Sequence, residues 1–178
     1  MPWLRKATDT PFGLRPYDEV KRIRPYNKTT AIAAIYPGDA VIKAAGNTID
    51  IGAASSTQYL GVAAMYSPIS TAEANFLVYD HPDQLFVIQD DSDTTAMTST
   101  HSGMNSDLTV TTGDTATFQS KHELDSNTAA ITAGLAMKVL GLHEIEDNSY
   151  ATATGNPRKW IVQFNAHYYR DVVGQTGV

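Results

Sequence analysis

Two short acidic segments contain the residues best suited to chemistry in this sequence. Residues 90–93 (Asp-Asp-Ser-Asp) supply the carboxylate oxygens that calcium prefers, but they lack the central glycine and the closing glutamate of an EF-hand loop. Residues 122–125 (His-Glu-Leu-Asp) group three possible metal ligands, but no second histidine or cysteine stands at ligand spacing. We therefore interpret residues 90–93 as a solvated turn and helix cap, and residues 122–125 as a polar loop. The sequence predicts no metal site and no cofactor, with a bound cation at residues 90–93 as the alternative.

Catalytic motifs are also missing from the sequence. It contains no G-x-S-x-G, no P-loop, no G-x-G-x-x-G and no H-E-x-x-H pattern, and it has no cysteine. Five histidines are scattered along the chain: His81, His101, His122, His143 and His167. Acidic residues are frequent enough to offer a carboxylate pair for glycoside hydrolysis, but no pair stands out. We predict that the protein is not an enzyme.

The segments that would have to position these residues have the pattern of short β-strands. Apolar runs alternate with turn residues such as Gly, Asp, Asn and Pro. The predicted strands cover residues 30–35, 40–43, 48–51, 59–66, 75–80, 84–89, 107–110, 116–118, 135–143 and 160–168. One short helix is predicted over residues 94–105. The predicted fold class is therefore all-β, an antiparallel β-barrel or sandwich (tulip- or jelly-roll-like) with at most one or two short helices.

Two details of this pattern make specific predictions. Residues 75–80 and 84–89 flank a three-residue connection, His-Pro-Asp, and a β-hairpin is the simplest arrangement for such a pair. Gly61 interrupts the apolar run over residues 59–66, which indicates either a bulge or a close approach of two backbones.

Residues 1–28 differ from the rest of the chain in charge and composition. They hold seven basic and three acidic side chains, a net charge of +4, whereas residues 29–178 carry a net charge of −10. Four prolines forbid a long helix and favour an extended backbone. We predict an extended N-terminal arm over residues 1–28 and a single β domain over residues 29–178. The arm is too apolar for a solvated tail, so it either lies along its own domain as an edge strand or docks on another subunit or partner.

The overall composition limits the classes of partner. At 178 residues the chain is long enough for one domain with a hydrophobic core. Its formal net charge of −6 argues against nucleic-acid binding, which needs clustered Lys and Arg. No apolar run is long enough for a signal peptide or a membrane span, so we expect a soluble cytoplasmic product with no nucleic-acid or membrane partner.

The order of several motifs along the chain is similar to that of a known family. Residues 10–16 (TPFGLRP), 36–41 (YPGDAV), 59–63 (YLGVA) and 78–89 (VYDHPDQLFVIQ) resemble segments of the decoration, or cement, proteins of tailed-bacteriophage heads. The similarity continues in residues 104–107 (MNSD), 123–126 (ELDS) and 138–142 (KVLGL), and so spans nearly the whole chain. It is a likeness of pattern and includes no signature site.

The resemblance implies a protein of the capsid exterior that binds the lattice of the major capsid protein and stabilises the head. It implies a β-barrel or tulip-like body, a virion location after assembly in the host cytoplasm, and a homo-oligomer, with a trimer favoured and a dimer as the alternative. It implies no catalytic residues. A phage tail or baseplate protein and a carbohydrate-binding β-sandwich are the alternative functions.

The predicted arm would supply the contacts to the capsid protein. Its aromatic and aliphatic side chains would act as anchors, and its arginines would pair with acidic groups of the partner. The predicted partner-binding residues are Trp3, Leu4, Arg5, Phe12, Leu14, Arg15, Tyr17, Arg22, Arg24 and Tyr26. On this interpretation, removal of residues 1–28 leaves a folded body that no longer binds capsids.

Overall fold

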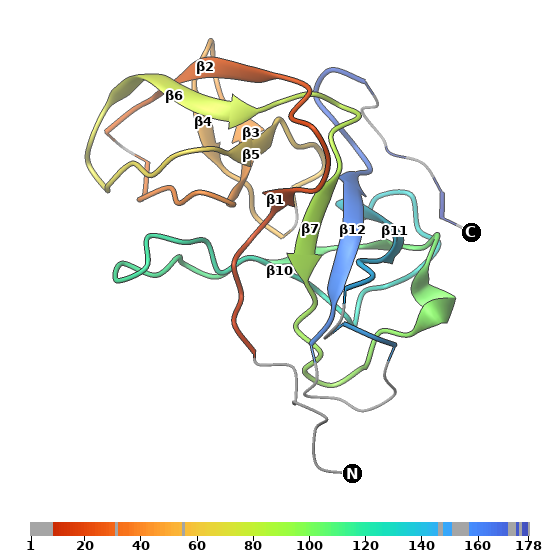
Figure 1. Ribbon diagram of the computed structural model, residues 1–178. Coiled ribbons are helices and arrows are strands. Elements are labelled where there is room, and N and C mark those ends of the chain that lie inside the picture. The colour runs from red at the N-terminus through yellow and green to blue at the C-terminus, as the bar shows by residue number, and fades with distance from the viewer. Residues whose placement is uncertain are drawn as a thin grey trace.

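The computed structural model describes residues 9–30, 32–54, 56–145, 148–150, 157–170, 174 and 176–177. Regular structure in these residues consists of twelve β-strands and one short 3-10 turn, η1 (Ser99–His101). The predicted all-β class is confirmed, with antiparallel sheets in a sandwich-like arrangement (Figure 1). No helix in this part of the chain is long and apolar enough to cross a membrane.

The first sheet contributes most of the strand residues of the larger of two cores. Its five strands lie in the order β1-β7-β12-β11-β8, and every neighbouring pair is antiparallel. They are β1 (Arg15–Pro16), β7 (Phe86–Gln89), β12 (Lys159–Phe164), β11 (Met137–Leu142) and β8 (Asn105–Ser106). A separate antiparallel pair is formed by β9 (Leu108–Thr109) and β10 (Glu123–Leu124). A bridge from Asp90 to Leu124 links β10 to the end of β7, so β9 and β10 pack against the same core as the first sheet.

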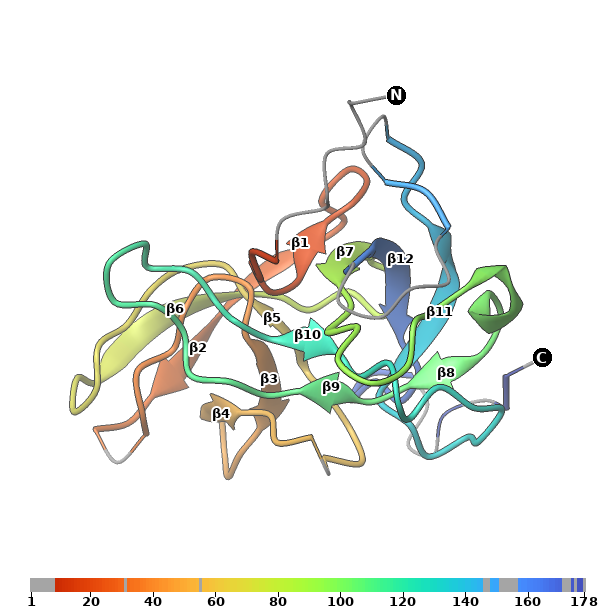
Figure 2. The same cartoon turned by 90° about the horizontal axis from the view of Figure 1, so that it is seen from below.

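The second sheet is strongly curled. Its five antiparallel strands lie in the order β2-β6-β5-β3-β4. They are β2 (Ile23–Lys28), β6 (Glu73–Tyr79), β5 (Gly61–Ala63), β3 (Ala40–Lys43) and β4 (Ile49–Ile51). A bridge between Asn27 and Thr48 brings its two outer strands together. Figure 2 shows the two sheets as neighbouring lobes joined by the chain segments between them.

Alternating side chains along the strands build the two cores. On β12, Trp160, Val162 and Phe164 are buried and the side chains between them are partly exposed, as the two-residue period of a strand requires. On β6, Phe76 and Val78 are buried in the second core. Burial of each large apolar side chain stabilises the fold by about 1.5–3 kcal/mol. The two cores therefore hold the surface segments of the chain in fixed positions.

The predicted hairpin between residues 75–80 and 84–89 is wrong, although both strands exist. β6 pairs with β2 and β5, whereas β7 pairs with β1 and β12, so the connection crosses from one sheet to the other. Phe76 and Val78 enter the second core, and Phe86 and Ile88 enter the first. Burial against non-local strands therefore outweighs the local preference of a short connection for a hairpin.

Other predicted elements differ in extent. The helix predicted over residues 94–105 is only the single turn η1, because its many hydroxyl side chains compete for backbone hydrogen bonds. The described part of residues 30–35 contributes one bridge, from Ile35 to Ser67, and residues 116–118 form a turn. The prediction for Gly61 is confirmed: a Cβ atom there would lie 2.0 Å from the carbonyl oxygen of Tyr79, so two backbones approach closely.

The described part of the predicted arm, residues 9–28, is extended but lies on the chain's own sheets. β1 is an edge strand of the first sheet, and β2 is an outer strand of the second. Figure 1 shows this segment running past β1 to β2 and so spanning both lobes. Residues 9–28 therefore match the alternative prediction, edge strands along the chain's own domain, and they do not form a separate arm. The physical reason is that the chain's own two cores offer its apolar side chains the nearest burial.

Candidate partner-binding surface

The structure divides the predicted partner-binding residues into three groups. Five are exposed or partly exposed: Phe12, Arg15, Tyr17, Arg22 and Arg24. Two are buried: Leu14 and Tyr26. Three lie outside the described residues: Trp3, Leu4 and Arg5. The candidate surface is therefore built from the first group.

Two hollows border β1. One has a volume of about 330 Å³ and the other about 310 Å³, and both are lined by Phe12, Arg15 and Pro16. Tyr17 lines the second hollow and is exposed. We call these four residues, Phe12, Arg15, Pro16 and Tyr17, the β1 surface. It combines two aromatic rings, a guanidinium and a concave surface on which the side chains of a partner could pack.

Contacts within the chain hold the β1 surface in place. The guanidinium of Arg15 lies 4.8 Å from the centre of the Phe12 ring, and its Nη2 donates to Gln119 Oε1 at 2.9 Å. The Tyr17 ring packs edge-on against the His143 ring, with their centroids 5.4 Å apart. Cation–π and edge-to-face contacts each stabilise such an arrangement by about 0.5–1.5 kcal/mol. These side chains are therefore positioned in advance, which lowers the entropy cost of binding a partner.

Proline interrupts both outer strands formed by the N-terminal segment. Pro16 lies in β1 and Pro25 lies in β2, and neither residue can donate a backbone hydrogen bond. A strand added by a partner needs a continuous row of backbone donors and acceptors. A partner is therefore expected to bind this segment through side chains rather than by strand addition.

Leu14 and Tyr26 cannot act as partner anchors, so their assignment is wrong. Leu14 is buried in the first core and Tyr26 in the second. In β2 the burial alternates, with Tyr26 and Lys28 inside and Pro25 and Asn27 outside. The strand period therefore places Tyr26 on the inner face of the sheet, where a partner cannot reach it.

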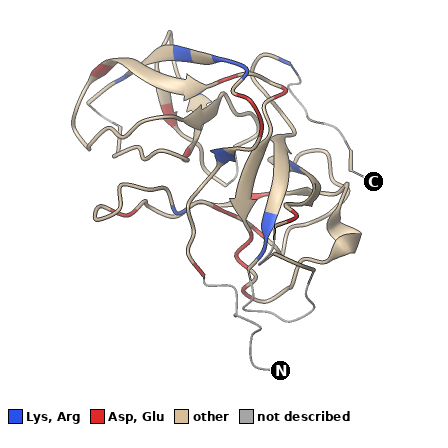
Figure 3. Cartoon of the chain, viewed as in Figure 1, with Lys and Arg blue, Asp and Glu red and all other residues tan. Residues whose placement is uncertain are grey.

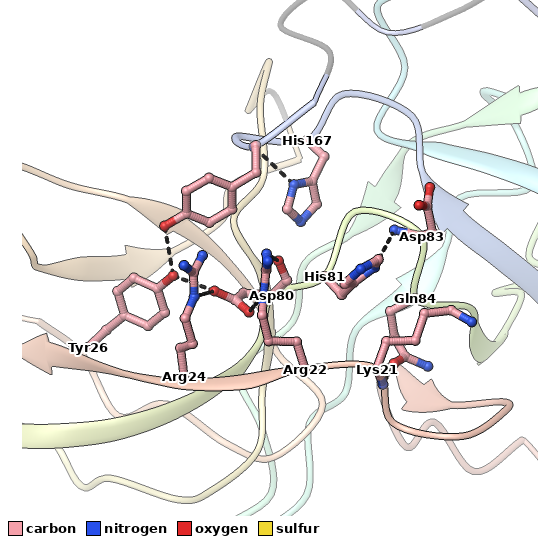
Figure 4. A network of polar contacts seen from close by, with 10 residues as sticks. Lys21, Arg22, Arg24, Tyr26, Asp80, His81, Asp83, Gln84 and His167 are labelled. Atoms are coloured by element: carbon pink, nitrogen blue, oxygen red, sulfur yellow. Dashed lines mark hydrogen bonds and ion pairs between the residues drawn. The ribbon is translucent and has the colours of Figure 1, made fainter.

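A buried carboxylate, that of Asp80, organises the arginines next to and within β2 (Figure 4). The Nε of Arg22 donates to Asp80 Oδ1 at 2.8 Å, and its Nη2 donates to the Asp80 backbone oxygen at 2.7 Å. The Nε of Arg24 and the hydroxyl of Tyr26 both donate to Asp80 Oδ2. Arg22 and Arg24 therefore already pair with an acidic group of their own chain, which corrects the expectation that they pair with a partner alone.

The C-terminal segment completes this network. The Tyr169 ring centre lies 4.4 Å from the guanidinium of Arg24 and 5.4 Å from that of Arg22. The Tyr169 hydroxyl is hydrogen-bonded to the Tyr26 hydroxyl at 2.9 Å. His167 is buried beside this ring, and its Nδ1 accepts the Tyr169 backbone N–H at 3.1 Å. Burial lowers the pKa of His167 to about 4, so this imidazole is neutral near pH 7.

Asp80 and Tyr169 are not among the residues predicted for this surface. The spacing of Arg22, Arg24 and Tyr26 was a usable signal, because residues two apart in a strand share one face. Two arginines on an inward face require a buried carboxylate. Asp80 lies 58 residues from Arg22 along the chain, however, and only the fold brings the two together.

The acidic residues 90–93 are not a fully solvated turn. Asp90 is buried, and its carboxylate accepts the Trp160 Nε1–H at 2.7 Å and the Arg158 backbone N–H at 3.0 Å. Burial raises the pKa of Asp90 to about 6. The interpretation as a solvated turn is therefore wrong for Asp90. Within the described part of the chain, no group of three or more His, Asp or Glu side chains could hold a metal ion.

His122 forms a buried pair with Asp39 instead of facing the neighbouring acidic residues. Its Nε2 lies 3.4 Å from Asp39 Oδ1, and its Nδ1 accepts the Ala40 backbone N–H at 3.2 Å. Burial lowers the pKa of His122 and raises the pKa of Asp39. A general base needs a ring nitrogen that faces the substrate. Both nitrogens of His122 face groups of the chain, so this pair is suited to fixing the start of β3.

Glu123 gives the protein a specific pH dependence. The Nε2 of Gln89 donates to Glu123 Oε1 at 2.9 Å and to Asp9 Oδ1 at 3.0 Å, so two carboxylates share one amide. Burial raises the pKa of Glu123 from its ordinary value of 4.5 to about 7, and nearby carboxylates add to this rise. The folded state therefore holds this proton more tightly than the unfolded chain. The contribution of Glu123 to stability is lost as the pH rises from about 4.5 to about 7.

Glu123→Gln is expected to stabilise the protein at pH 8 by on the order of 1 kcal/mol, because the amide removes the cost of ionisation in a buried site. At pH 4 the effect should be small, since the wild-type carboxyl is then protonated. Chemical denaturation at the two pH values measures the difference. Asp114→Asn is the control, because the Ala116 backbone N–H and other contacts lower the pKa of the Asp114 carboxyl, and its removal should give no gain at pH 8. A destabilised Glu123→Gln at pH 8 would contradict this account.

Comparison with known proteins assigns no function to the surfaces described above. No protein-family model, no curated protein and no solved structure matches this chain.

Proposed function

We propose that this protein decorates the head of a tailed bacteriophage, where it binds the outer surface of the major capsid protein lattice and stabilises the head. The β1 surface is the observation that carries the proposal, because it presents two aromatic rings and a guanidinium beside two hollows. Tyr and Arg are enriched among the residues that dominate binding energy at protein interfaces. The order of the sequence motifs supports the same function.

The distribution of charge suits a partner with an acidic surface. Figure 3 places Lys and Arg on β1, along β2 and on β12, whereas Asp and Glu are spread over many connections. In a chain with a net charge of −6, the N-terminal segment is thus an unusually basic part. Electrostatic steering would orient this segment toward an acidic partner before contact is made.

We propose that the protein is located on the outer surface of the capsid in the virion, after assembly in the host cytoplasm. Its partner is the major capsid protein, and it binds as a homo-oligomer, with a trimer favoured over a dimer. Only 18% of its residues are charged, so much of the surface is neutral and suited to broad contact areas. We propose no catalytic role and no cofactor.

Co-sedimentation with empty capsids of the encoding phage tests the proposal. The wild-type protein should bind saturably, and Tyr17→Ala and Arg15→Gln should each weaken binding by about tenfold if these residues are interface anchors. Both side chains are exposed, so each variant should remain folded and lose no more stability than the contact it removes, about 0.5–1.5 kcal/mol. Leu140→Ala is the matched control, since Leu140 is equally exposed but lies on β11, away from the β1 surface. It should bind like the wild type.

The possible outcomes separate the alternatives. A wild-type protein that does not sediment with capsids would contradict the proposal, and electron microscopy of intact particles would then show whether it belongs to the tail or baseplate. Binding on a glycan array that is lost when exposed tyrosines are replaced would favour the carbohydrate-binding alternative. Equal capsid binding by Tyr17→Ala and by the wild type would exclude the β1 surface as the contact.

A further inference from the structure

Arg22 and Arg24 retain exposed hydrogen-bonding capacity although both pair with Asp80. Their side chains are 34% and 40% exposed, whereas the Asp80 side chain is fully buried. A guanidinium has five N–H donors, and Asp80 occupies the Nε of each arginine and one Nη2. The Nη2 of Arg24 is buried and has no hydrogen-bond partner among the described residues, so the donors that remain open to a partner are the Nη1 groups of the two arginines. A second acceptor could therefore bind to these guanidiniums without displacing Asp80.

The charge of this group is unbalanced. Both guanidiniums are permanently protonated, and Asp80 supplies one carboxylate to the two of them. The adjoining side chains of Tyr26 and Tyr169 are uncharged phenols. The group therefore keeps a net charge of about +1, because two cations share one anion. One further carboxylate would neutralise it.

Tyr169 makes the group a rigid platform. Tyr169 is 42% exposed, and both guanidiniums lie within 5.4 Å of its ring centre. Figure 4 shows Arg22 and Arg24 converging on Asp80 from below, with the Tyr26 ring beside Arg24. Guanidiniums held in this way lose less side-chain entropy when they bind an anion than free arginines do. The Tyr169 ring also offers an apolar surface to the rest of a bound side chain.

We propose that Arg22, Arg24 and Tyr169 form a receptor for a carboxylate side chain on an acidic segment of a protein partner. A single excess positive charge matches one carboxylate, whereas anionic membranes and nucleic acids require several clustered Lys and Arg. Exposed Tyr168, whose ring packs edge-on against that of Tyr169, extends the platform for a peptide. The inference rests on the proposed function only for the identity of the partner, the capsid protein.

Titration of the full-length protein with an octaglutamate peptide tests the receptor, with an octaglutamine peptide as the neutral comparison. By isothermal titration calorimetry at low salt, octaglutamate should bind about tenfold more tightly than octaglutamine, because charge-assisted bonds to arginine are the stronger kind. Arg24→Gln and Tyr169→Leu should each weaken octaglutamate binding by about tenfold. Tyr169→Phe keeps the ring and should bind like the wild type.

Lys138→Gln is the matched control, because it removes the same charge from β11 of the first sheet. Its effect on octaglutamate affinity should stay below about twofold, as expected for a remote screened charge. Equal weakening by Lys138→Gln and Arg24→Gln would overturn the proposal in favour of diffuse attraction. Binding to phosphatidylserine vesicles without binding to octaglutamate would overturn it in favour of a membrane. Tyr169→Leu does not touch Asp80, so it gives an answer even if Arg24→Gln fails to fold.

Capsid co-sedimentation separates the receptor from the proposed function. Octaglutamate binding that depends on Arg24, in a protein that does not sediment with capsids, would support the receptor and contradict the capsid role. Capsid binding in the absence of any octaglutamate binding would support the capsid role and contradict the receptor. Loss of both activities in Arg24→Gln, with both retained in Lys138→Gln, is the result expected if the capsid protein supplies the carboxylate.

Discussion

Removal of residues 1–28 is expected to unfold the protein rather than to release a folded body. The deletion removes β1 and β2, one outer strand from each sheet, and takes Leu14 from the first core and Tyr26 from the second. Loss of one buried leucine side chain costs about 2–5 kcal/mol. The whole stability of a domain is about 5–15 kcal/mol. The combined losses, including the donors that satisfy Asp80, should therefore leave little or no folded population.

Circular dichroism in the near ultraviolet and thermal unfolding measure this outcome. The shorter deletion of residues 1–8 is the control, because it leaves the contacts described for residues 9–28 in place, and it should keep a cooperative transition. A cooperative transition in the protein lacking residues 1–28 would show that β1 and β2 are dispensable. Because a deletion that unfolds the protein also abolishes binding, single substitutions at exposed positions are the proper test of capsid contacts.

The presence and inward faces of several strands could be predicted because their pattern is local. Predicted residues 40–43 coincide with β3, and predicted residues 135–143 contain β11. The predicted strand over residues 160–168 contains most of β12 but is too long at its C-terminal end. Asn165 ends that strand's alternation, since its buried amide donates to the carbonyl oxygens of Ala133 and Leu135. That detail depends on a neighbouring segment and has no local signal.

The pairing of the strands could not be predicted from the same pattern. A short connection such as residues 81–83 favours a hairpin only if both flanking strands bury their apolar faces against the same core. Phe76 and Phe86 belong to different cores, and the fully buried Asp80 lies at the point where the chain changes sheets. A strand pattern states which side chains are buried, but it does not state which core receives them.

The residue types of the candidate surface could be predicted from the sequence, but the exposure of each residue could not. The aromatic and basic character of residues 12–24 is a property of composition, and Phe12, Arg15 and Tyr17 do lie at the surface. Leu14 lies in the same segment and is also apolar, but it is buried because it packs into the first core beside β1. Exposure within an apolar segment is decided by the tertiary partner, and no rule based on residue type distinguishes Leu14 from Phe12.

Asp80→Asn is expected to destabilise the protein by about 2–3 kcal/mol, because buried donors lose their acceptor while the two guanidiniums remain partly exposed to water. The carboxylate accepts from Arg22, Arg24 and Tyr26, and an amide can accept at only one of its two positions. Two guanidiniums would then be left without a neutralising charge, and the amide nitrogen would face another donor. The same group joins β2, the crossing between the sheets and, through Tyr169, the C-terminal segment.

Urea denaturation of Asp80→Asn and Asp83→Asn measures the effect of burial on otherwise similar arginine–aspartate pairs. Asp83 also pairs with an arginine, Arg170, at 2.6 Å, but its side chain is 59% exposed, so its loss should cost no more than about 1 kcal/mol. In the Asp80→Asn background, a further Arg24→Gln substitution should be less harmful than in the wild type, because it removes an unpaired cation. Similar small effects at both aspartates would show that the two sheets and the receptor arginines do not depend on this carboxylate.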